Sequence, residues 1–187
     1  MTSSSPQILA VCTGNICRSP AIERLLAVRL TPAIRVASAG TAGVVGAPIA
    51  PIMTELMEQR GVPTAGFAAR RITEDMINEV ELILTATVKH RAKIVAMVPN
   101  AMKYTFTLME FAQSLHYLSL SSIAHLHPSL RIQPLADHCR AVRSHMRIPE
   151  SELDIPDPYG FDESVYHTAF SLIVEATTTV NHVLTVR

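Results

Sequence analysis

The chain has few of the features that mark secreted, membrane-bound or nucleic-acid-binding proteins. Its 187 residues include only three cysteines, too few and odd in number for a disulfide framework. No apolar run approaches the ~20 residues that a transmembrane helix needs, and the start, MTSSSPQ, lacks the basic and apolar segments of a secretion signal. Sixteen basic residues balance sixteen acidic ones, which gives no electrostatic reason to expect nucleic acid as a partner. We therefore expect a cytoplasmic protein with no membrane span.

Short apolar runs alternate with segments of helical periodicity. The run at 7–12 is continuously apolar, which is typical of a strand buried on both faces of a parallel sheet. The pattern predicts an α/β fold, a doubly wound and mainly four-stranded parallel sheet with helices on both faces, in a single domain over 1–187. The ligand site of such a fold lies beyond the carboxyl ends of the strands. We expect the strands at 7–12, 33–40, 80–87 and 102–108 and the helices from Pro20 onwards and at 50–61, 88–99 and 164–184.

Residues from about 114 to 150 are the least regular part of the chain. Apolar pieces that carry histidines alternate there with prolines and serines, which predicts short helices joined by loops in an insertion on the same domain. Five of the eight histidines and Cys139 fall in this segment, which raises the question of a metal site. Their spacing matches no standard zinc pattern, so we expect no metal there.

The stretch VCTGNICRSP (11–20) joins the first expected strand to the first expected helix. A loop in that place aims several backbone N–H groups at one point, where the helix dipole also favours negative charge. Arg18 adds a fork of donors that fits two oxygens of a phosphate or another tetrahedral oxyanion. Cys12, at the strand end, would face this cradle, which favours its thiolate form. The sequence therefore predicts a nucleophile beside an oxyanion site.

The other residues of this loop are expected to shape the cradle. Gly14 permits a tight backbone, and Asn15 tolerates a left-handed conformation or binds neighbouring backbone groups. Ser19 is expected to be the N-cap of the helix or to donate a hydrogen bond to the Cys12 thiolate, and the sequence leaves both roles open. The residues expected to contact the substrate here are Thr13, Gly14, Asn15, Ile16, Cys17 and Ser19.

The same stretch resembles the signature of the low-molecular-weight protein tyrosine phosphatase family. The resemblance implies the phosphotyrosine phosphatase I-like fold and a phosphatase without metal or cofactor. It also implies that Cys12 is the nucleophile that forms a phosphocysteine intermediate and that Arg18 binds the phosphoryl oxygens. Further similarity covers most of the chain outside 114–150, through SAGT (38–41), ARRIT (69–73), ELIL (81–84) and FTLMEFA (106–112).

The family also uses a general acid within a DPY sequence, and this chain has DIPDPYG at 154–160. Asp157 is the matching position. A phenolate is a poor leaving group unless it is protonated as the P–O bond breaks, and the same carboxylate can then activate water. Asp154 is an alternative acid that lacks the following proline and aromatic residue. Tyr159 is expected to line the entrance and contact an aromatic substrate.

Some positions depart from the family pattern. Family members commonly have an aspartate at the position of Ala50, a histidine at Phe67, and an aspartate and a methionine at Glu81 and Ala86; the loop 42–48 also lacks a large aromatic residue. These changes bear on substrate preference more than on phosphoryl chemistry. Cys17 is either a reversible disulfide partner of Cys12, as the resemblance implies, or a packed small residue.

The sequence thus predicts a phosphatase for protein phosphotyrosine or small aryl phosphates. Relatives act on bacterial tyrosine kinases of polysaccharide export, so the resemblance implies a tyrosine kinase as a regulatory partner. One alternative is an arsenate reductase on the same scaffold, but such enzymes relay oxidation to further cysteines, and only Cys139 is spare. The other alternative is a non-catalytic phosphate-binding regulatory module.

Overall fold

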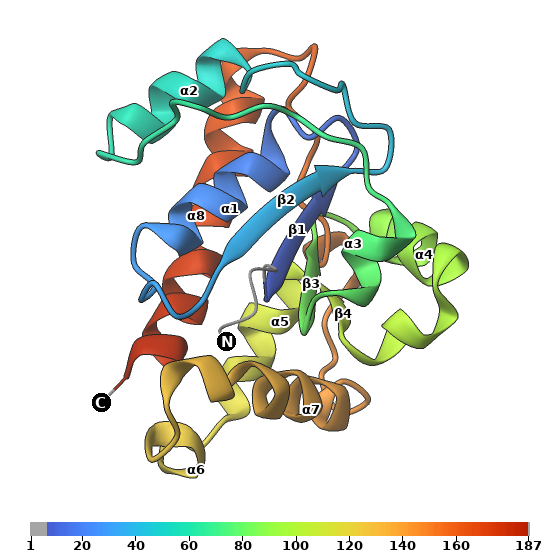
Figure 1. Cartoon of the computed structure of the whole chain (residues 1–187), viewed down its shortest axis with the longest axis vertical. Coiled ribbons are helices and arrows are strands. Elements are labelled where there is room, and N and C mark those ends of the chain that lie inside the picture. The colour runs from blue at the N-terminus through green and yellow to red at the C-terminus, as the bar shows by residue number, and fades with distance from the viewer. Residues whose placement is uncertain (1–6, 187) are drawn as a thin grey trace.

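The computed structural model describes residues 7–186. The expectation of no secretion signal rests largely on residues 1–6, which lie outside the described residues. Four parallel strands form one sheet in the order β2-β1-β3-β4 (Figure 1), so the predicted single-domain parallel fold is confirmed. The strands are β1 (Ile8–Cys12), β2 (Val36–Gly40), β3 (Leu82–Thr85) and β4 (Thr105–Thr107).

Successive residues of the central strands face two different helical layers, as the period of a strand requires. Ile8 and Ala10 of β1 belong to the larger core, whereas Leu9 and Val11 belong to a second core on the opposite face. The larger core contains residues of α1 (Arg18–Ala27), α2 (Pro51–Glu58), α5 (Leu108–Ser114), α7 (Ile132–Val142) and α8 (Glu163–Thr185). The second core contains residues of α3 (Glu74–Asn78), α4 (Val88–Met97) and the 3-10 helix η1 (Pro99–Lys103). Helices therefore cover both faces of the sheet, and the side chains on both faces of β1 are buried.

The boundaries differ from the prediction in ways that side-chain contacts explain. Cys17, not Ser19, is the N-cap of α1, so the prediction of Ser19 as the cap is wrong. The hydroxyl of Ser19 contacts Cys12 and Asn15 instead of a free N–H group of the helix. Helix α5 follows β4 directly and was not predicted. It begins with a capping box in which the side chains of Thr107 and Glu110 each bind the backbone N–H of the other.

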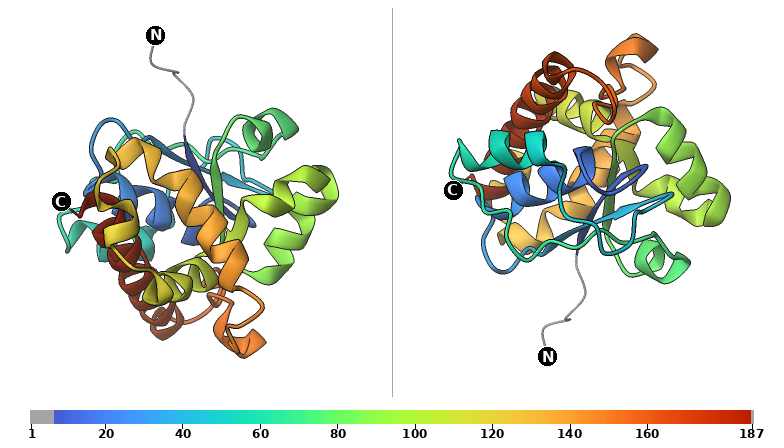
Figure 2. Two further views of the ribbon diagram at one scale, coloured as in Figure 1. Left: turned by 90° about the horizontal axis from the view of Figure 1, so that it is seen from below. Right: turned by 90° about the horizontal axis from the view of Figure 1, so that it is seen from above.

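The segment from 115 to 131 lies at the amino ends of the strands. Seen from below in Figure 2, the yellow and orange part of the chain that holds α6 and α7 covers this end of the sheet. The side-chain amide of Gln7, just before β1, donates to the carbonyl of Ser129 at 3.5 Å, which agrees with that placement. Short helices joined by loops form here as predicted: η2 (Leu115–Tyr117), α6 (Ser121–Ala124) and η3 (Pro128–Leu130), with η4 (Glu150–Glu152) further along.

Arg131 connects this segment to the last helix. Its side chain is buried, and its guanidinium donates to the carbonyls of Val183, Leu184 and Val186 at the end of α8. It also donates to the carbonyls of Ala124 and Leu126. The last carbonyls of a helix have no partner within it, so a buried cation there satisfies them and complements the helix dipole.

Candidate active site

Cys12 is the last residue of β1, and its side chain is buried at the carboxyl end of the sheet. Its Sγ lies 3.0 Å from the Oγ of Ser19. Ser19 Oγ also accepts a hydrogen bond from the Asn15 side chain at 2.9 Å. That contact uses a lone pair of Ser19, and the single hydroxyl proton of Ser19 has two acceptors within reach, the Cys12 sulfur at 3.0 Å and the carbonyl of Ala39 at 3.4 Å. Of the two roles left open for Ser19, the structure shows the one beside the thiol.

Asn15 fixes the shape of the loop between β1 and α1. It has φ 58, the left-handed conformation that the sequence suggested. Its side chain is fully buried, and its Oδ1 accepts from the backbone N–H of Arg70 at 2.9 Å. Its Nδ2 donates to Ser19 and to the hydroxyl of Ser38 on β2 at 2.8 Å. Ser38 in turn donates to Glu23 of α1 at 2.5 Å, so one chain of hydrogen bonds ties the loop to its neighbours.

Two glycines, which were not singled out from the sequence, allow close backbone approaches at the end of β2 and just after it. A Cβ on Gly40 would overlap the carbonyl oxygen of Thr13, and one on Gly43 would overlap the carbonyl oxygen of Arg70. The backbone N–H of Thr41 and that of Ala42 donate to the carbonyls of Cys12 and Thr13, both at 2.9 Å. The small residues of SAGT were the only signal of this close approach.

Arg18 joins the β1–α1 loop to the loop at 154–160. Its side chain is only 3% exposed although it carries a charge. One terminal nitrogen donates to the carbonyl of Ile155 at 3.1 Å, and the other lies 2.5 Å from a carboxylate oxygen of Asp157. Its Nε has no hydrogen-bond partner among residues 7–186. A buried, positively charged donor without an acceptor is costly, and an oxyanion would satisfy it.

The two aspartates of the 154–160 loop have different environments. The side chain of Asp157 is 45% exposed, and it accepts from the backbone N–H of Tyr159 at 3.4 Å as well as pairing with Arg18. Asp154 points elsewhere: its Oδ1 accepts from the backbone N–H of Val88 at 2.7 Å. Tyr159 is exposed, whereas Pro158, which lies between Asp157 and Tyr159, is buried.

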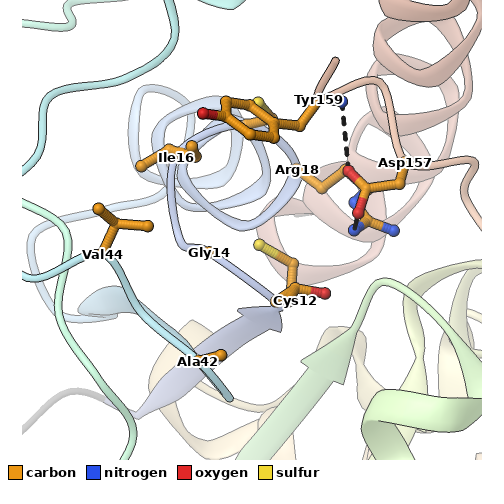
Figure 3. Close-up of a pocket in the computed structure, with 10 residues that line it drawn as sticks. Cys12, Gly14, Ile16, Arg18, Ala42, Val44, Asp157 and Tyr159 are labelled. Atoms are coloured by element: carbon orange, nitrogen blue, oxygen red, sulfur yellow. Dashed lines mark hydrogen bonds and ion pairs between the residues drawn. The ribbon is translucent and has the colours of Figure 1, made fainter. Parts of the chain in front are cut away.

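These residues surround a cavity of about 190 Å³ (Figure 3). Cys12 lies at its base, Asp157 on one side, and Tyr159, Ile16 and Val44 around its mouth. Asn15 and Ser19, which we expected to contact the substrate, are absent from the lining and support the loop from behind. The lining residues among those described are Cys12, Thr13, Gly14, Ile16, Cys17, Arg18, Ala42, Val44, Asp157 and Tyr159.

The other two cysteines have the character of neutral thiols. Burial raises the pKa of Cys17 to about 12 although it lines the cavity, and burial also raises the pKa of Cys139 to about 12. Thiolates attack disulfides and sulfenic acids, so both residues are poorly suited to rapid redox exchange. No disulfide links the cysteines of the described chain, and within 7–186 no three side chains of the metal-binding types are grouped as metal ligands.

His90, on the first turn of α4, is a neighbour of the site that the sequence reasoning missed. Its Nε2 lies 2.9 Å from the hydroxyl of Thr13, and its Nδ1 lies 2.6 Å from that of Thr87. Burial lowers the pKa of His90 to about 4, with a further contribution from the charge of Arg18. The imidazole is therefore neutral near pH 7, and it bridges the two threonines.

The departures from the family pattern at Ala50, Phe67, Glu81 and Ala86 lie outside the cavity lining. Ala50 is buried, and its N–H donates to the carbonyl of Ile16 at 2.8 Å. Ala86 binds Val11 and Ile155 through its backbone, and Phe67 lies against the guanidinium of Arg24, 5.8 Å from the ring centre. By contrast, the loop at 42–48 supplies Ala42 and Val44 to the wall, which makes that wall aliphatic.

Comparisons with known proteins agree with this architecture. The profile of the family described as "Low molecular weight phosphotyrosine protein phosphatase" matches residues 7–121, a range that stops short of the 154–160 loop. The chain is 44% identical over 93 residues to Etp of Escherichia coli K12, a low molecular weight protein-tyrosine-phosphatase. That match spans 50% of this chain and 62% of Etp.

Two longer matches include the second half of the chain. A putative low molecular weight protein-tyrosine-phosphatase of Klebsiella pneumoniae is 31% identical over 169 residues, which is 90% of both chains. The structure of the YwlE arginine phosphatase from Geobacillus stearothermophilus covers 95% of this chain and 91% of its own, with a TM-score of 0.70. At 24% identity, this last likeness shows the fold. Profile, relatives and fold together show that the chain belongs to the low-molecular-weight phosphotyrosine protein phosphatase family.

Proposed function

We propose that this protein is a phosphatase that hydrolyses phosphotyrosine and related aryl phosphates through a phosphocysteine intermediate. The observation that carries the proposal is the buried Arg18, which lines the same cavity as Cys12 and whose Nε has no hydrogen-bond partner among residues 7–186. A phosphoryl group accepts hydrogen bonds from this guanidinium and from the backbone N–H groups of the β1–α1 loop. The same contacts hold the phosphorus close to the nucleophile, which supplies proximity as well as charge stabilisation.

In the first step the Cys12 thiolate attacks phosphorus in line with the leaving oxygen. The S–P bond forms while the P–O bond breaks, and Asp157 gives its proton to the leaving phenolate. The contact of Ser19 with the sulfur stabilises the thiolate. Arg18 is paired with Asp157 in the structure, so its guanidinium must be shared between this carboxylate and the phosphoryl oxygens.

In the second step a water molecule attacks the phosphocysteine. The Asp157 carboxylate takes the proton from this water, the new P–O bond forms, and the S–P bond breaks to return the Cys12 thiolate. Inorganic phosphate is then released. Both steps use side chains and backbone N–H groups of this chain together with water.

The walls of the cavity favour an aryl substrate. Ile16, Ala42 and Val44 are aliphatic, and Tyr159 offers an aromatic face at the mouth. Such surfaces suit a phenyl ring better than a positively charged guanidinium. YwlE, which shares the fold, is an arginine phosphatase, so phosphoarginine is the informative competing substrate.

We further propose a cytoplasmic location and a protein tyrosine kinase as the partner. The three unpaired cysteines fit a reducing compartment. The relatives named as protein-tyrosine-phosphatases fit a phosphotyrosine protein as substrate. Within residues 7–186, none of the helices combines the length and the apolar character needed to cross a membrane.

The arsenate reductase alternative has no support from the position of the spare thiol. Cys139 is fully buried on α7, and its raised pKa keeps it neutral. A relay of oxidation from Cys12 would need an accessible thiolate.

A substrate panel tests the proposal. Purified protein, Cys12→Ser and the matched control Cys139→Ala are assayed with phenyl phosphate, a phosphotyrosine peptide, a phosphoserine peptide, phosphoarginine, and arsenate with thioredoxin. We expect turnover of the two aryl phosphates, loss of it in Cys12→Ser, and its retention in Cys139→Ala. Normal turnover by Cys12→Ser would refute the mechanism, and tight binding of phosphotyrosine without hydrolysis by the unmutated protein would favour the non-catalytic module.

A further inference from the structure

The loop that carries Asp157 is attached to the body of the protein just before this residue. The backbone N–H of Ile155 donates to the carbonyl of Ala86 at 2.9 Å, at the end of β3. The carbonyl of Ile155 accepts from Arg18 at 3.1 Å. Asp154 makes the third contact, from its Oδ1 to the backbone N–H of Val88 at 2.7 Å. These three contacts precede Asp157 by two or three residues.

The partner of Asp154 is the first residue of α4. Thr87 is the N-cap of this helix, and its hydroxyl accepts from the N–H of His90. The N–H of Val88 is another of the groups at a helix start that have no partner within the helix. A carboxylate at this position also meets the positive end of the helix dipole. Asp154 therefore binds α4 through both a hydrogen bond and its charge.

The same turn of α4 also contacts the nucleophile's loop. His90 is hydrogen-bonded to the hydroxyl of Thr13, the residue after Cys12, and to that of Thr87. The first turn of α4 thus lies between the two loops of the site and contacts each of them. A residue that fixes one loop to this turn fixes its position relative to the other loop.

We infer that Asp154 is a positioning residue that holds Asp157 at the cavity by tying its loop to the amino end of α4. This inference rests on the proposed function. Pro156 and Pro158 flank Asp157, and their fixed φ angles limit how far the backbone can move between the anchor and the acid. Asp154 is not among the residues that line the cavity, whereas Asp157 is. The alternative of Asp154 as the acid is thereby replaced by a role through Asp157.

The leaving group of the substrate separates this role from general destabilisation. A misplaced acid slows substrates whose leaving groups need a proton and has little effect on those that depart unprotonated. We would measure kcat and KM for phenyl phosphate and 2,4-dinitrophenyl phosphate with the unmutated protein, Asp154→Ala, Asp154→Asn and Asp162→Ala. Asp162 is a matched control because it is an exposed aspartate beyond Asp157 whose side chain makes no capping hydrogen bond to α8.

We expect Asp154→Ala to lower kcat for phenyl phosphate by ~10-fold or more and to change kcat for dinitrophenyl phosphate by less than ~3-fold, because small misplacements of a catalytic group are costly. KM and inhibition by inorganic phosphate should stay close to the unmutated values, since the oxyanion contacts are intact. Asp154→Asn keeps an oxygen that accepts from Val88. Its kcat for phenyl phosphate should fall by only ~3-fold, because only the interaction of the charge with the helix dipole is lost. Asp162→Ala should match the unmutated protein with both substrates.

Equal losses with both substrates, or an Asp154→Ala variant as active as Asp162→Ala, would overturn the inference. If Asp154→Ala does not fold, Asp154→Asn decides, because a loss that is the same for both leaving groups would also overturn it. Failure of the proposed function looks different, because the unmutated protein would then hydrolyse neither substrate. If the unmutated protein hydrolyses both substrates and Asp154→Ala is equally active, only the positioning role is contradicted.

Discussion

The carboxyl and amino ends of the sheet are both fixed by buried polar side chains, but these side chains bind different targets. At the carboxyl ends, Arg18 binds the loop that carries Asp157, and Asn15 ties the loop after Cys12 to Ser19 and Arg70. At the amino ends, Arg131 binds the last carbonyls of α8. Contacts of the first kind set where reacting groups lie, and those of the second kind hold a helix in place. Substitutions at the two ends should therefore separate activity from stability.

The largest effect is expected at Asp157. Asp157→Ala removes the proton donor, which in general contributes ~10²–10⁴-fold, so kcat for phenyl phosphate should fall by at least ~100-fold. Binding of inorganic phosphate should persist, because Arg18 and the loop N–H groups remain. Steady-state kinetics with phosphate as a competitive inhibitor measures both quantities. A variant with unchanged kcat would remove Asp157 from the mechanism.

Asn15 should give the next largest effect on activity. Asn15→Gly keeps a backbone that accepts φ 58 but removes the bonds to Ser19, Ser38 and Arg70, and we expect kcat to fall ~10-fold. Asn15→Ala also strains the left-handed conformation and should be less active still. The kcat of each variant is measured at the same folded fraction as the unmutated protein, and circular dichroism gives that fraction. Full activity in both variants would show that the loop holds its shape without this network.

Arg131 should affect stability and not catalysis. Arg131→Ala leaves the carbonyls at the end of α8 without a charged donor, which should lower the free energy of unfolding by about 2–3 kcal/mol. The kcat of the folded protein should stay unchanged. Chemical denaturation and kinetics on the same samples check this, with Arg140→Ala on the exposed face of α7 as the control. A fall in kcat at unchanged stability would link the amino ends of the strands to the chemistry.

His90 should give the smallest effect, seen as acid sensitivity. Its pKa in the folded protein is about 4, below the ordinary value of 6.5, so the unfolded chain takes up the proton more readily. Its contribution to stability is present above about pH 6.5 and is lost as the pH falls towards 4. Between pH 7 and pH 5 the unmutated protein should lose about 1–2 kcal/mol more than His90→Gln does. Denaturation at both pH values tests this, with exposed His167→Gln as the control, and identical losses in His90→Gln and the unmutated protein would contradict it.

The order of the four strands and of α1, α2, α4 and α8 was accessible from local pattern alone, whereas α3 and α5 were not predicted. A run such as 7–12 has no polar residue between Ile8 and Val11, which is typical of a strand buried on both faces. The loop with Cys12 and Arg18 was equally visible, because its residues are contiguous. Asp157 was found through its DPY sequence. Its proximity to Arg18, 139 positions earlier in the chain, leaves no local signal in the sequence.

The remaining features depend on contacts between distant segments. Nothing near Asp154 indicates that its partner is the N–H of Val88, and nothing near His90 indicates Thr13. The sequence left open whether Ser19 caps the helix or contacts Cys12, and only the folded structure shows the contact with Cys12. The position of the 115–131 segment at the end of the sheet away from the site follows from tertiary packing, which its irregular sequence does not encode locally.

The central claim is that Cys12 accepts the phosphoryl group, and trapping that intermediate tests it most directly. Asp157→Ala, which should slow hydrolysis of the intermediate, is mixed with 2,4-dinitrophenyl phosphate, quenched in acid, digested and examined by mass spectrometry, with Cys12→Ser as the control. The account predicts one added phosphoryl group on the peptide that contains Cys12, and none on the Cys12→Ser or Cys139 peptides. Turnover of the substrate with no phosphorylated Cys12 at any quench time would contradict it.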